Sequence, residues 1–592
     1  MKKTLLTLLI GLFSLSTLHA GKAWPYPITV IQSNGTPITV FLHGDENFHW
    51  YTDQQGNILE RTGNDFKAIT VDKETFFAQT KVAQLTRGTM LEPIAPTPSN
   101  FPHTGSPRAV VILAQYTDRK FTTPNPRASF DQYLNAASGH PVDLGTGENL
   151  NYGSVKQYFM EQSDSTYSPQ FDVYGPITLP QNMAYYGGTS DGGDDEKYIQ
   201  LLTDACNAVK DSVDFTQYDQ DQDGKIDLVY IVYAGYGQSN GGPNETMWAK
   251  SFYGFSSPTF DGKGINRGGI SNELNGFEGA FGYNLTPQDT TKTFSNAVKY
   301  INGVGLFIHE FSHCLGLPDF YGAHLDASKI YDNQGMEDWS VMDAGTYISM
   351  GYCPRNYTAW EREALGWEII PTIFASKQYS LIDEKGKRAV KVLNPINPNE
   401  YFVLELFEDK GWDQRFARLQ NSQVNYNPST KGLLLYHVDY DATAFSLSYN
   451  RVNDVVGHPR MAVVPADGIL KSSYWIDNGI TSLQYYQQLN GDLFRVDGEI
   501  NSPLFTQADG LPVAAWWTAA DPTPIRNINY YWGAVYFDFL DSVATTSIDK
   551  TIKGVESIED GKIYTLDGRF FGTSTDALPH GIYIRNGRKF VR

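Results

Sequence analysis

The eleven residues that begin at His309 read H-E-x-x-H-x-x-G-x-P-D, and this pattern restricts the local fold of the 592-residue chain more than any other stretch. Residues four apart lie on one face of an α-helix, so His309 and His313 are predicted to point the same way. Gly316 predicts a left-handed residue that ends this helix, and Pro318 prevents the helix from resuming. The chain is then expected to fold back and bring Asp319 toward the two histidines.

Two imidazoles and a carboxylate are typical ligands of a catalytic zinc ion, whose fourth position is left to water. We therefore expect His309, His313 and Asp319 to bind Zn²⁺. Glu310 is the candidate general base, which would take a proton from a zinc-bound water that attacks a peptide carbonyl. The short H-E-x-x-H part arises by chance in about one chain of this length in a hundred, and the added Gly and Asp lower that rate roughly a further hundredfold. The whole pattern indicates zinc-dependent peptide hydrolysis.

A second motif follows about two dozen residues later and reads W-S-V-M-D-A-G from residue 339. It is similar to the Met-turn that underlies the zinc in metzincin peptidases, and Met342 is the candidate methionine. Ordinary core packing is the alternative interpretation of a single methionine. Many metzincins carry a tyrosine two residues after this methionine, where its hydroxyl assists the oxyanion. Here Ala344 stands at that place, and Tyr347 is the nearest substitute.

Length and composition indicate a globular protein of several domains. A chain of 592 residues is expected to divide into three to five domains, and 37 Tyr and 33 Phe with only 19% charged residues argue against disorder. The net charge of −20 argues against a nucleic-acid partner. The acidic balance is compatible with secretion and with bound Ca²⁺.

The first twenty residues have the basic start, apolar run and small-residue end of a secretory signal peptide. The apolar run extends from Leu5 to Phe13, and cleavage is expected after Ala20. A membrane anchor is the alternative, but this run is shorter than the ~20 residues that a membrane span needs. We therefore expect a secreted or cell-surface protein without a membrane span.

Three cysteines, Cys206, Cys314 and Cys353, allow at most one disulfide, so stability is expected to come from hydrophobic cores and metals. Cys314 directly follows His313 and could be suspected as a thiolate ligand. One residue along a helix points about 100° away from the metal-facing side, so we do not expect Cys314 to bind.

Residues 21–107 contain short alternating strands and predict a small β-rich domain that ends in a Pro- and Thr-rich linker at about 93–107. Its place before the zinc motif makes it a candidate pro-domain that blocks the active site until it is removed. The segment has no cysteine, which excludes a thiolate latch on the zinc. Asp45, Glu46 and His49 are the candidate side chains for plugging the metal, and an ordinary turn between strands is the alternative.

Residues 108–370 alternate strand-like and helix-like segments, which predicts an α/β sheet packed on helices. The expected strands lie at 109–116 and 228–233, and the expected helices lie near 155–160, 196–209 and 305–315.

An acidic loop, D-Q-D-Q-D-G-K-I-D from residue 219, matches the first nine positions of an EF-hand loop. The twelfth position is Tyr230 and the loop runs into a strand, so a true EF-hand is not expected. We predict a structural Ca²⁺ site, with a solvated Asp-rich turn as the alternative. The expected ligands are Asp219, Asp221, Asp223, Asp227 and the backbone carbonyl of Lys225.

Residues 371–543 show the period-two pattern of strands and predict an all-β sandwich. The sequence His437-Val438-Asp439 within it could suggest a second metal site, but a polar cluster at the end of a strand is the expected interpretation. Residues 551–592 form a further short β unit, for which a role in sorting or attachment is expected.

These motifs together resemble the immune inhibitor A family of secreted zinc peptidases. The resemblance covers roughly residues 108–540 and is carried by the zinc motif, the acidic loop with its following strand, and shorter motifs at 153–159, 352–367 and 411–413. It implies a metzincin-like endopeptidase with His309, His313 and Asp319 on zinc and Glu310 as base. The last block is similar to sorting domains of the type IX secretion system, which implies secretion machinery as a partner.

The sequence thus predicts an α/β metzincin-like zinc peptidase domain between a small β-rich pro-domain, residues 21–107, and an all-β sandwich followed by a small β domain. The predicted function is a secreted zinc endopeptidase, made as a latent zymogen, that hydrolyses proteins or peptides. The alternative is a surface adhesion or glycan- or protein-binding protein in which the sandwich is the functional part.

Overall fold

The computed structural model describes most of the chain outside several gaps. The described residues are 17–19, 21–25, 27–45, 49–70, 76, 101–136, 151–187, 197–276, 280–281, 284–286, 289–293, 300–322, 335–394, 396–413, 431–455, 457–466, 489, 491–494, 525–539, 563–565, 570–574, 578, 582–585 and 588–591. The apolar run of the predicted signal peptide, Ala20, Glu46 and residues 93–100 of the predicted linker lie outside them.

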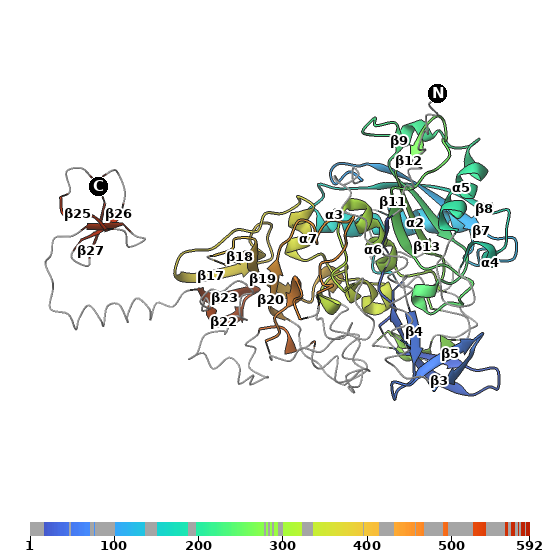
Figure 1. Cartoon of the computed structure of the whole chain (residues 1–592), viewed down its shortest axis with the longest axis horizontal. Coiled ribbons are helices and arrows are strands. Elements are labelled where there is room, and N and C mark those ends of the chain that lie inside the picture. Colours follow the sequence, from blue (N-terminus) through green and yellow to red (C-terminus); the bar gives the residue numbers. More distant parts are fainter. Residues whose placement is uncertain are drawn as a thin grey trace, which may run out of the picture.

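A mixed six-stranded sheet forms the centre of the region that contains the zinc motif (Figure 1). Its strands are β7 (Arg108–Gln115), β8 (Gln170–Thr178), β10 (Val229–Tyr233), β13 (Arg267–Asn272), β11 (Lys250–Tyr253) and β1 (Thr17–His19). The four strands in the order β13-β10-β7-β8 are parallel, whereas β11 and then β1 add antiparallel strands at one edge. Strands β7 and β10 confirm the two apolar strands predicted from the sequence.

Helices cover both faces of this sheet because alternate residues of β7 and β10 enter two different cores. Val111 and Val232 lie in the core with Phe307 of helix α6 (Val304–Leu315). Ile112 and Ile231 lie in the core with helix α5 (Tyr198–Val209). Helices α2 (Pro126–Asn135) and α3 (Val155–Gln162) contribute to the first core. The three predicted helices are therefore present, and α2 is an addition.

The N-terminal region is an antiparallel sheet that joins the later chain. It contains β2 (Ile28–Ile31), β3 (Pro37–Gly44), β4 (His49–Thr52), β5 (Ile58–Thr62) and β6 (Asp65–Ala68), and its edge pairs with β14 (Ala280–Phe281). Arg61 also donates hydrogen bonds to the carbonyls of Gly241 and Gly242. The β-rich character expected of this region is present in the described residues.

The described end of the predicted linker differs from an exposed connection. Phe101 is 1% exposed, its amide donates to the Cys314 carbonyl at 2.9 Å, and its ring packs edge-on against Phe311. The indole of Trp367 donates to the His103 carbonyl at 2.7 Å. Phe101 is thus packed on the zinc-motif helix, whereas residues 104–106 are exposed.

Two antiparallel sheets follow in the region predicted as a sandwich. One contains β17 (Lys377–Ile382), β23 (Ala534–Phe539) and β22 (Ile525–Tyr531), and the other contains β18 (Ala389–Leu393), β19 (Glu400–Glu408), β20 (Lys431–Asp439) and β21 (Met461–Val463). The two sheets share one core, which includes Leu404 and Phe537. The opposite face of the second sheet, with Val403 and Tyr436, enters the same core as helix α6. The sandwich-like region is therefore packed into the body that carries the zinc motif.

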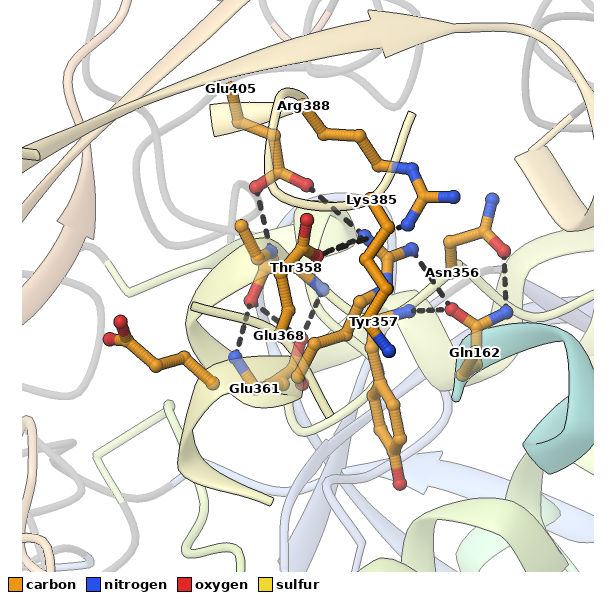
Figure 2. A network of polar contacts seen from close by, with 12 residues as sticks. Gln162, Asn356, Tyr357, Thr358, Glu361, Glu368, Lys385, Arg388 and Glu405 are labelled. Carbon is orange, nitrogen blue, oxygen red and sulfur yellow. Dashed lines mark hydrogen bonds and ion pairs between the residues drawn. The ribbon is translucent and has the colours of Figure 1, made fainter. Parts of the chain in front are cut away.

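A buried polar network lies at this junction (Figure 2). It surrounds helix α7 (Ala359–Ala364), whose N-terminus is closed by a capping box between Thr358 and Glu361. Glu405 of β19 accepts the Ala359 amide at 2.9 Å and lies 3.8 Å from the Arg362 guanidinium. Gln162 of α3 accepts from Arg362 at 3.1 Å, so three distant segments are linked.

The remaining described elements are small. They are α4 (Met183–Tyr186), β9 (Lys225–Ile226), β12 (Gly264–Ile265), β15 (Asn284–Thr286) and β16 (Asp289–Thr293). Near the C-terminus, β24 (Ile563–Thr565), β25 (Phe570–Gly572), β26 (Ile582–Arg585) and β27 (Arg588–Val591) form one four-stranded sheet. Among the described helices, none is both long enough and apolar enough to cross a lipid bilayer.

Candidate metal centre

Helix α6 carries the first two predicted ligands and ends where the sequence predicts. Gly316 adopts φ 104°, the left-handed conformation expected of a C-terminal cap. Its amide donates to the His313 carbonyl at 2.9 Å, and the Leu317 amide reaches back to the Ser312 carbonyl at 3.1 Å. These bonds reverse the chain direction at the C-terminal end of α6. The reversal places Asp319 beside the histidines.

The three predicted zinc ligands lie together and are buried. His309 Nε2 and His313 Nε2 are 3.2 Å apart, and Asp319 Oδ1 lies 3.2 Å and 3.3 Å from them. Ligand atoms ~2.0–2.1 Å from a tetrahedral zinc ion are about 3.3 Å apart, so the three atoms fit a single ion. Asp319 Oδ1 has no hydrogen-bond donor among the described residues although it is fully buried. A cation at this point would satisfy that oxygen.

The outer nitrogen of each histidine is fixed by a backbone carbonyl. His309 Nδ1 donates to the Val341 carbonyl at 2.8 Å, and His313 Nδ1 donates to the Leu317 carbonyl at 2.7 Å. Since a carbonyl only accepts, both protons lie on Nδ1 and each Nε2 keeps a lone pair directed at the common centre. The donor set therefore suits a metal ion.

The third predicted ligand, Asp319, is held by a residue that sequence reasoning missed. Asn450 Nδ2 donates to Asp319 Oδ2 at 2.6 Å, and the Asp319 amide donates to Asn450 Oδ1 at 2.7 Å. This pair of bonds fixes the Asp319 side chain so that Oδ1 faces the histidines. Asn450 lies 131 residues further along the chain, in the region predicted as a sandwich, and no local pattern marks it.

Charge and burial act in opposite directions on the two carboxylates of the centre. Burial raises the pKa of Asp319, but the nearby histidines act more strongly and bring the net pKa well below its ordinary range. For Glu310, burial dominates and raises the pKa to about 8, against the charge of His309 and a hydrogen bond from Gly21. A glutamate with a pKa close to neutral is suited to exchange protons with water.

The segment around Met342 contacts His309 and the chain next to Asp319 through its backbone carbonyls. Met342 is fully buried, its amide donates to Ser340 Oγ at 3.0 Å, and its carbonyl accepts the amide of Phe320, the residue after Asp319, at 2.9 Å. The neighbouring Val341 carbonyl holds His309. The turn therefore supports one ligand directly and another through the backbone. Burial of Met342 does not distinguish a Met-turn from an ordinary core methionine, because both interpretations predict it. The backbone contacts of the turn with His309 and Phe320 are an additional, supporting role.

The residues that follow the predicted signal peptide cross this centre. The Gly21 amide donates to Glu310 Oε1 at 2.9 Å, and a Cβ added to Gly21 would lie 3.5 Å from the imidazole of His309. The indole of Trp248 donates to the Gly21 carbonyl at 2.8 Å, and the Tyr347 hydroxyl donates to the Lys22 carbonyl at 2.7 Å. Tyr347, the suggested oxyanion helper, thus binds the backbone of this segment.

The two described latency candidates lie elsewhere. Asp45 is buried but does not belong to the metal-like group, and His49 packs its ring 5.0 Å from that of Trp248. Burial lowers the pKa of His49 to about 4, so its ring is neutral at ordinary pH. The close contact with Glu310 comes from the backbone of Gly21, for which the sequence offered no signal because any residue has a backbone amide.

The acidic loop brings three of its predicted ligands together. Carboxylate oxygens of Asp219, Asp221 and Asp227 all lie within 4.8 Å of one another. Asp219 Oδ1 is buried without a hydrogen-bond partner among the described residues, while its other oxygen lies 2.5 Å from the Lys263 ammonium. Burial raises the pKa of Asp227 to about 6. Two of these crowded carboxylates, Asp219 and Asp227, are buried and Asp221 is exposed, and the three together fit a hard cation.

The fourth predicted carboxylate, Asp223, is not part of that group. It accepts the Lys225 amide at 2.8 Å, and Lys225 begins β9, which pairs with β12. The loop leads into a strand, as expected, and a metal bond from the Lys225 carbonyl remains a prediction.

The three cysteines are buried and form no disulfide. Cys314 faces away from the histidines, and its thiol lies 3.3 Å from Ser251 Oγ. Burial raises the pKa of the Cys314 thiol to about 11, so it stays protonated. His437, in the strand-end cluster, contacts Glu400 at 3.0 Å and belongs to none of the metal-like groups among the described residues.

Comparisons with known proteins point to the same part of the chain. Residues 113–368 match the family model described as immune inhibitor A peptidase M6, catalytic domain. The chain is 28% identical over 291 residues to immune inhibitor A of Bacillus thuringiensis subsp. alesti, an alignment that covers 43% of this chain and 39% of that protein. It is 25% identical over 306 residues to the pre-pro-metalloprotease PrtV of Vibrio cholerae serotype O1 (strain M66-2), covering 47% and 31% of the two chains.

The chain therefore spans less than half of the length of these relatives. The matched segment contains the histidine helix, Asp319 and the turn at Met342. It ends before Asn450, so the residue that holds Asp319 lies outside the matched segment. Residues 113–368 are thus an immune inhibitor A-like metallopeptidase domain.

Proposed function

We propose that the chain is a secreted zinc endopeptidase of the metzincin type that hydrolyses peptide bonds in proteins and is made in a latent form. The observation that carries this proposal is the buried triangle of His309 Nε2, His313 Nε2 and Asp319 Oδ1, with sides of 3.2–3.3 Å, beside the carboxylate of Glu310. These three side chains would hold the ion. Zinc, when bound, supplies a Lewis acid that polarises the peptide carbonyl and lowers the pKa of water.

Glu310 performs the proton transfers of the reaction. Its carboxylate accepts a proton from the water that attacks the carbonyl carbon, and it then gives this proton to the nitrogen of the leaving residue. The carbon–nitrogen bond breaks, and one carboxylate and one amine are formed from one peptide bond and one water.

The N-terminal segment supports the proposal of latency. Gly21 lies against both Glu310 and His309, so a substrate cannot occupy the same place while the segment is present. The β-rich region 27–68 holds the segment there, since the Ala23 amide donates to the Gly44 carbonyl at 2.8 Å. In this proposal the block is steric and requires neither Asp45 nor His49.

Two further roles belong to the same proposal. A structural Ca²⁺ ion in the loop of Asp219, Asp221 and Asp227 would neutralise three close carboxylates. The region predicted as a sandwich would complete the catalytic centre through Asn450. The small C-terminal sheet, β24 to β27, would serve in sorting or attachment at the cell surface, with secretion machinery as its partner.

The test compares the full-length chain before and after limited proteolysis of its N-terminal region, with casein as substrate and zinc content measured alongside. Little activity before and strong activity after proteolysis is expected. Arg108 begins the central strand β7, so productive cleavage is expected upstream of residue 101. Glu310→Gln should retain zinc and lose ~10²–10⁴-fold in turnover, whereas Glu60→Gln, at an exposed position, should behave like the parent. Full activity of Glu310→Gln would refute the proposed base.

A further inference from the structure

The segment that blocks the metal centre is expected to begin at Gly21, the residue after the predicted signal-peptide cleavage, and its nitrogen lies at Glu310. Trp248 and Tyr347 bind the backbone carbonyls of Gly21 and Lys22. Hydrogen bonds to backbone carbonyls bind a peptide without reading its sequence. The segment therefore indicates how a substrate backbone lies in the site.

The contact with Glu310 sets the register of this peptide. In the proposed reaction, Glu310 gives its proton to the nitrogen of the residue that leaves. The nitrogen of Gly21 lies 2.9 Å from Glu310 Oε1 and so occupies the position of that leaving nitrogen. Gly21 then corresponds to the first residue after the cleaved bond, and Lys22 corresponds to the second.

The side chain of Lys22 enters a buried acidic pocket. Its ammonium lies 3.1 Å from Asp343 Oδ1, with 4% of the Lys22 side chain and 1% of the Asp343 side chain exposed. The ring of Tyr321 lies 5.9 Å from the same ammonium and adds a cation–π contact. Removal of one partner of a buried ion pair is strongly destabilising, because the other charge is left buried without a partner or solvent.

The carboxylate of Asp343 is held in place independently of Lys22. Its Oδ2 accepts the Glu337 amide at 2.9 Å, and its Oδ1 accepts the Ala344 amide at 2.8 Å. The pocket thus keeps its geometry and its negative charge when the N-terminal segment leaves. A substrate that enters next meets a fixed carboxylate at the second position after the cleaved bond.

We infer that Asp343 is a specificity-determining residue and that the peptidase prefers protein substrates with lysine or arginine at the second position after the cleaved bond. This inference rests on the proposed function. The N-terminal segment carries a lysine at this second position, and the ion pair between Lys22 and Asp343 contributes to holding the segment in the site.

The test uses the full chain after activation by limited proteolysis and a digest of unrelated proteins as a peptide mixture, with every cleaved bond read by mass spectrometry. Lysine and arginine should be enriched at the second position after the cut. For two otherwise identical peptides, lysine there should give kcat/KM at least about tenfold above norleucine, which has similar length and no charge. Cleavage without such a preference would overturn the inference while leaving the proposed function intact. Absence of any cleavage would instead overturn the proposed function.

Variants separate the role of the charge from the role of the fold. Asp343→Asn should still cleave but lose the preference for lysine, whereas Asp131→Asn, at an exposed position in α2, should retain it. In the full-length chain, Lys22→Met should speed amide hydrogen exchange in residues 22–24 by about tenfold or more, and Lys67→Met, at an exposed position, should not. Exchange that is unchanged in Lys22→Met would show that the ion pair does not hold the segment, and would refute the pocket.

Discussion

Replacement of Glu361 by glutamine should make the protein less sensitive to alkaline conditions. Burial raises the pKa of Glu361 from 4.5 to about 7, against hydrogen bonds from Ser340 and Thr358. The folded protein therefore binds a proton at this site between pH 4.5 and 7, where the unfolded chain has lost it. Stability falls as pH rises through that window, because unfolding is favoured by loss of the proton.

The size of the effect follows from the two pKa values. A rise from 4.5 to about 7 corresponds to a loss of about 3 kcal/mol of unfolding free energy between pH 4.5 and pH 8. Glu361→Gln has no proton to lose and keeps an oxygen that can accept from the Thr358 amide, now 2.6 Å away, so the capped start of α7 can be retained. The unfolding free energy of the variant, relative to that of the parent, should therefore be about 3 kcal/mol more favourable at pH 8 than at pH 4.5.

The assay is urea unfolding of the full chain, followed by tryptophan fluorescence, at pH 4.5 and pH 8 for the parent, Glu361→Gln and Glu60→Gln. Glu60→Gln removes the same charge from an exposed position. The difference in unfolding free energy between Glu60→Gln and the parent should therefore stay nearly constant between the two pH values. Effects of pH on metal binding are shared by all three proteins and cancel in the differences. A difference between Glu361→Gln and the parent that changed by less than about 1 kcal/mol would refute the assignment of the buried charge.

Three further outcomes are expected. Asn450→Ala should weaken zinc binding about 10- to 100-fold in chelator competition, since both hydrogen bonds that orient Asp319 are lost; unchanged affinity would show that other contacts fix this ligand. Asp227→Asn should remove the rise in melting temperature that calcium gives to the chelated parent, and a calcium-indifferent parent would exclude the site. Gly316→Ala should cost about 1–2 kcal/mol, measured by urea unfolding, because φ is 104° there, and a neutral substitution would contradict the strain.

The parts of the site that the sequence could predict are those governed by local rules. The spacing of His309 and His313, the left-handed Gly316 and the return of Asp319 all follow within one turn of helix and one cap. Periodic apolar residues predict the helices α5 and α6, and continuous apolar runs predict the strands β7 and β10, which are buried on both faces of the sheet.

The parts that could not be predicted depend on contacts between distant segments. Asn450 reaches Asp319 across 131 residues, and Gly21 reaches Glu310 across 289. An asparagine side chain and a backbone amide carry no periodic pattern, so the sequence cannot indicate which distant group they meet. The same reason explains why residues 371–543 were predicted as a separate sandwich, although Val403 and Tyr436 share a core with α6.

The bond between Asn450 and Asp319 has a consequence for the order in which the molecule matures. A ribosome completes the segment with both histidines and Asp319 long before it reaches residue 450. Until then the carboxylate of Asp319 lacks the two hydrogen bonds with Asn450 that orient it, and the proposed metal centre is incomplete. Gly21, which contacts Glu310, belongs to the first part of the chain to be made. In the proposed peptidase, the blocking segment would therefore be available before the metal centre is complete.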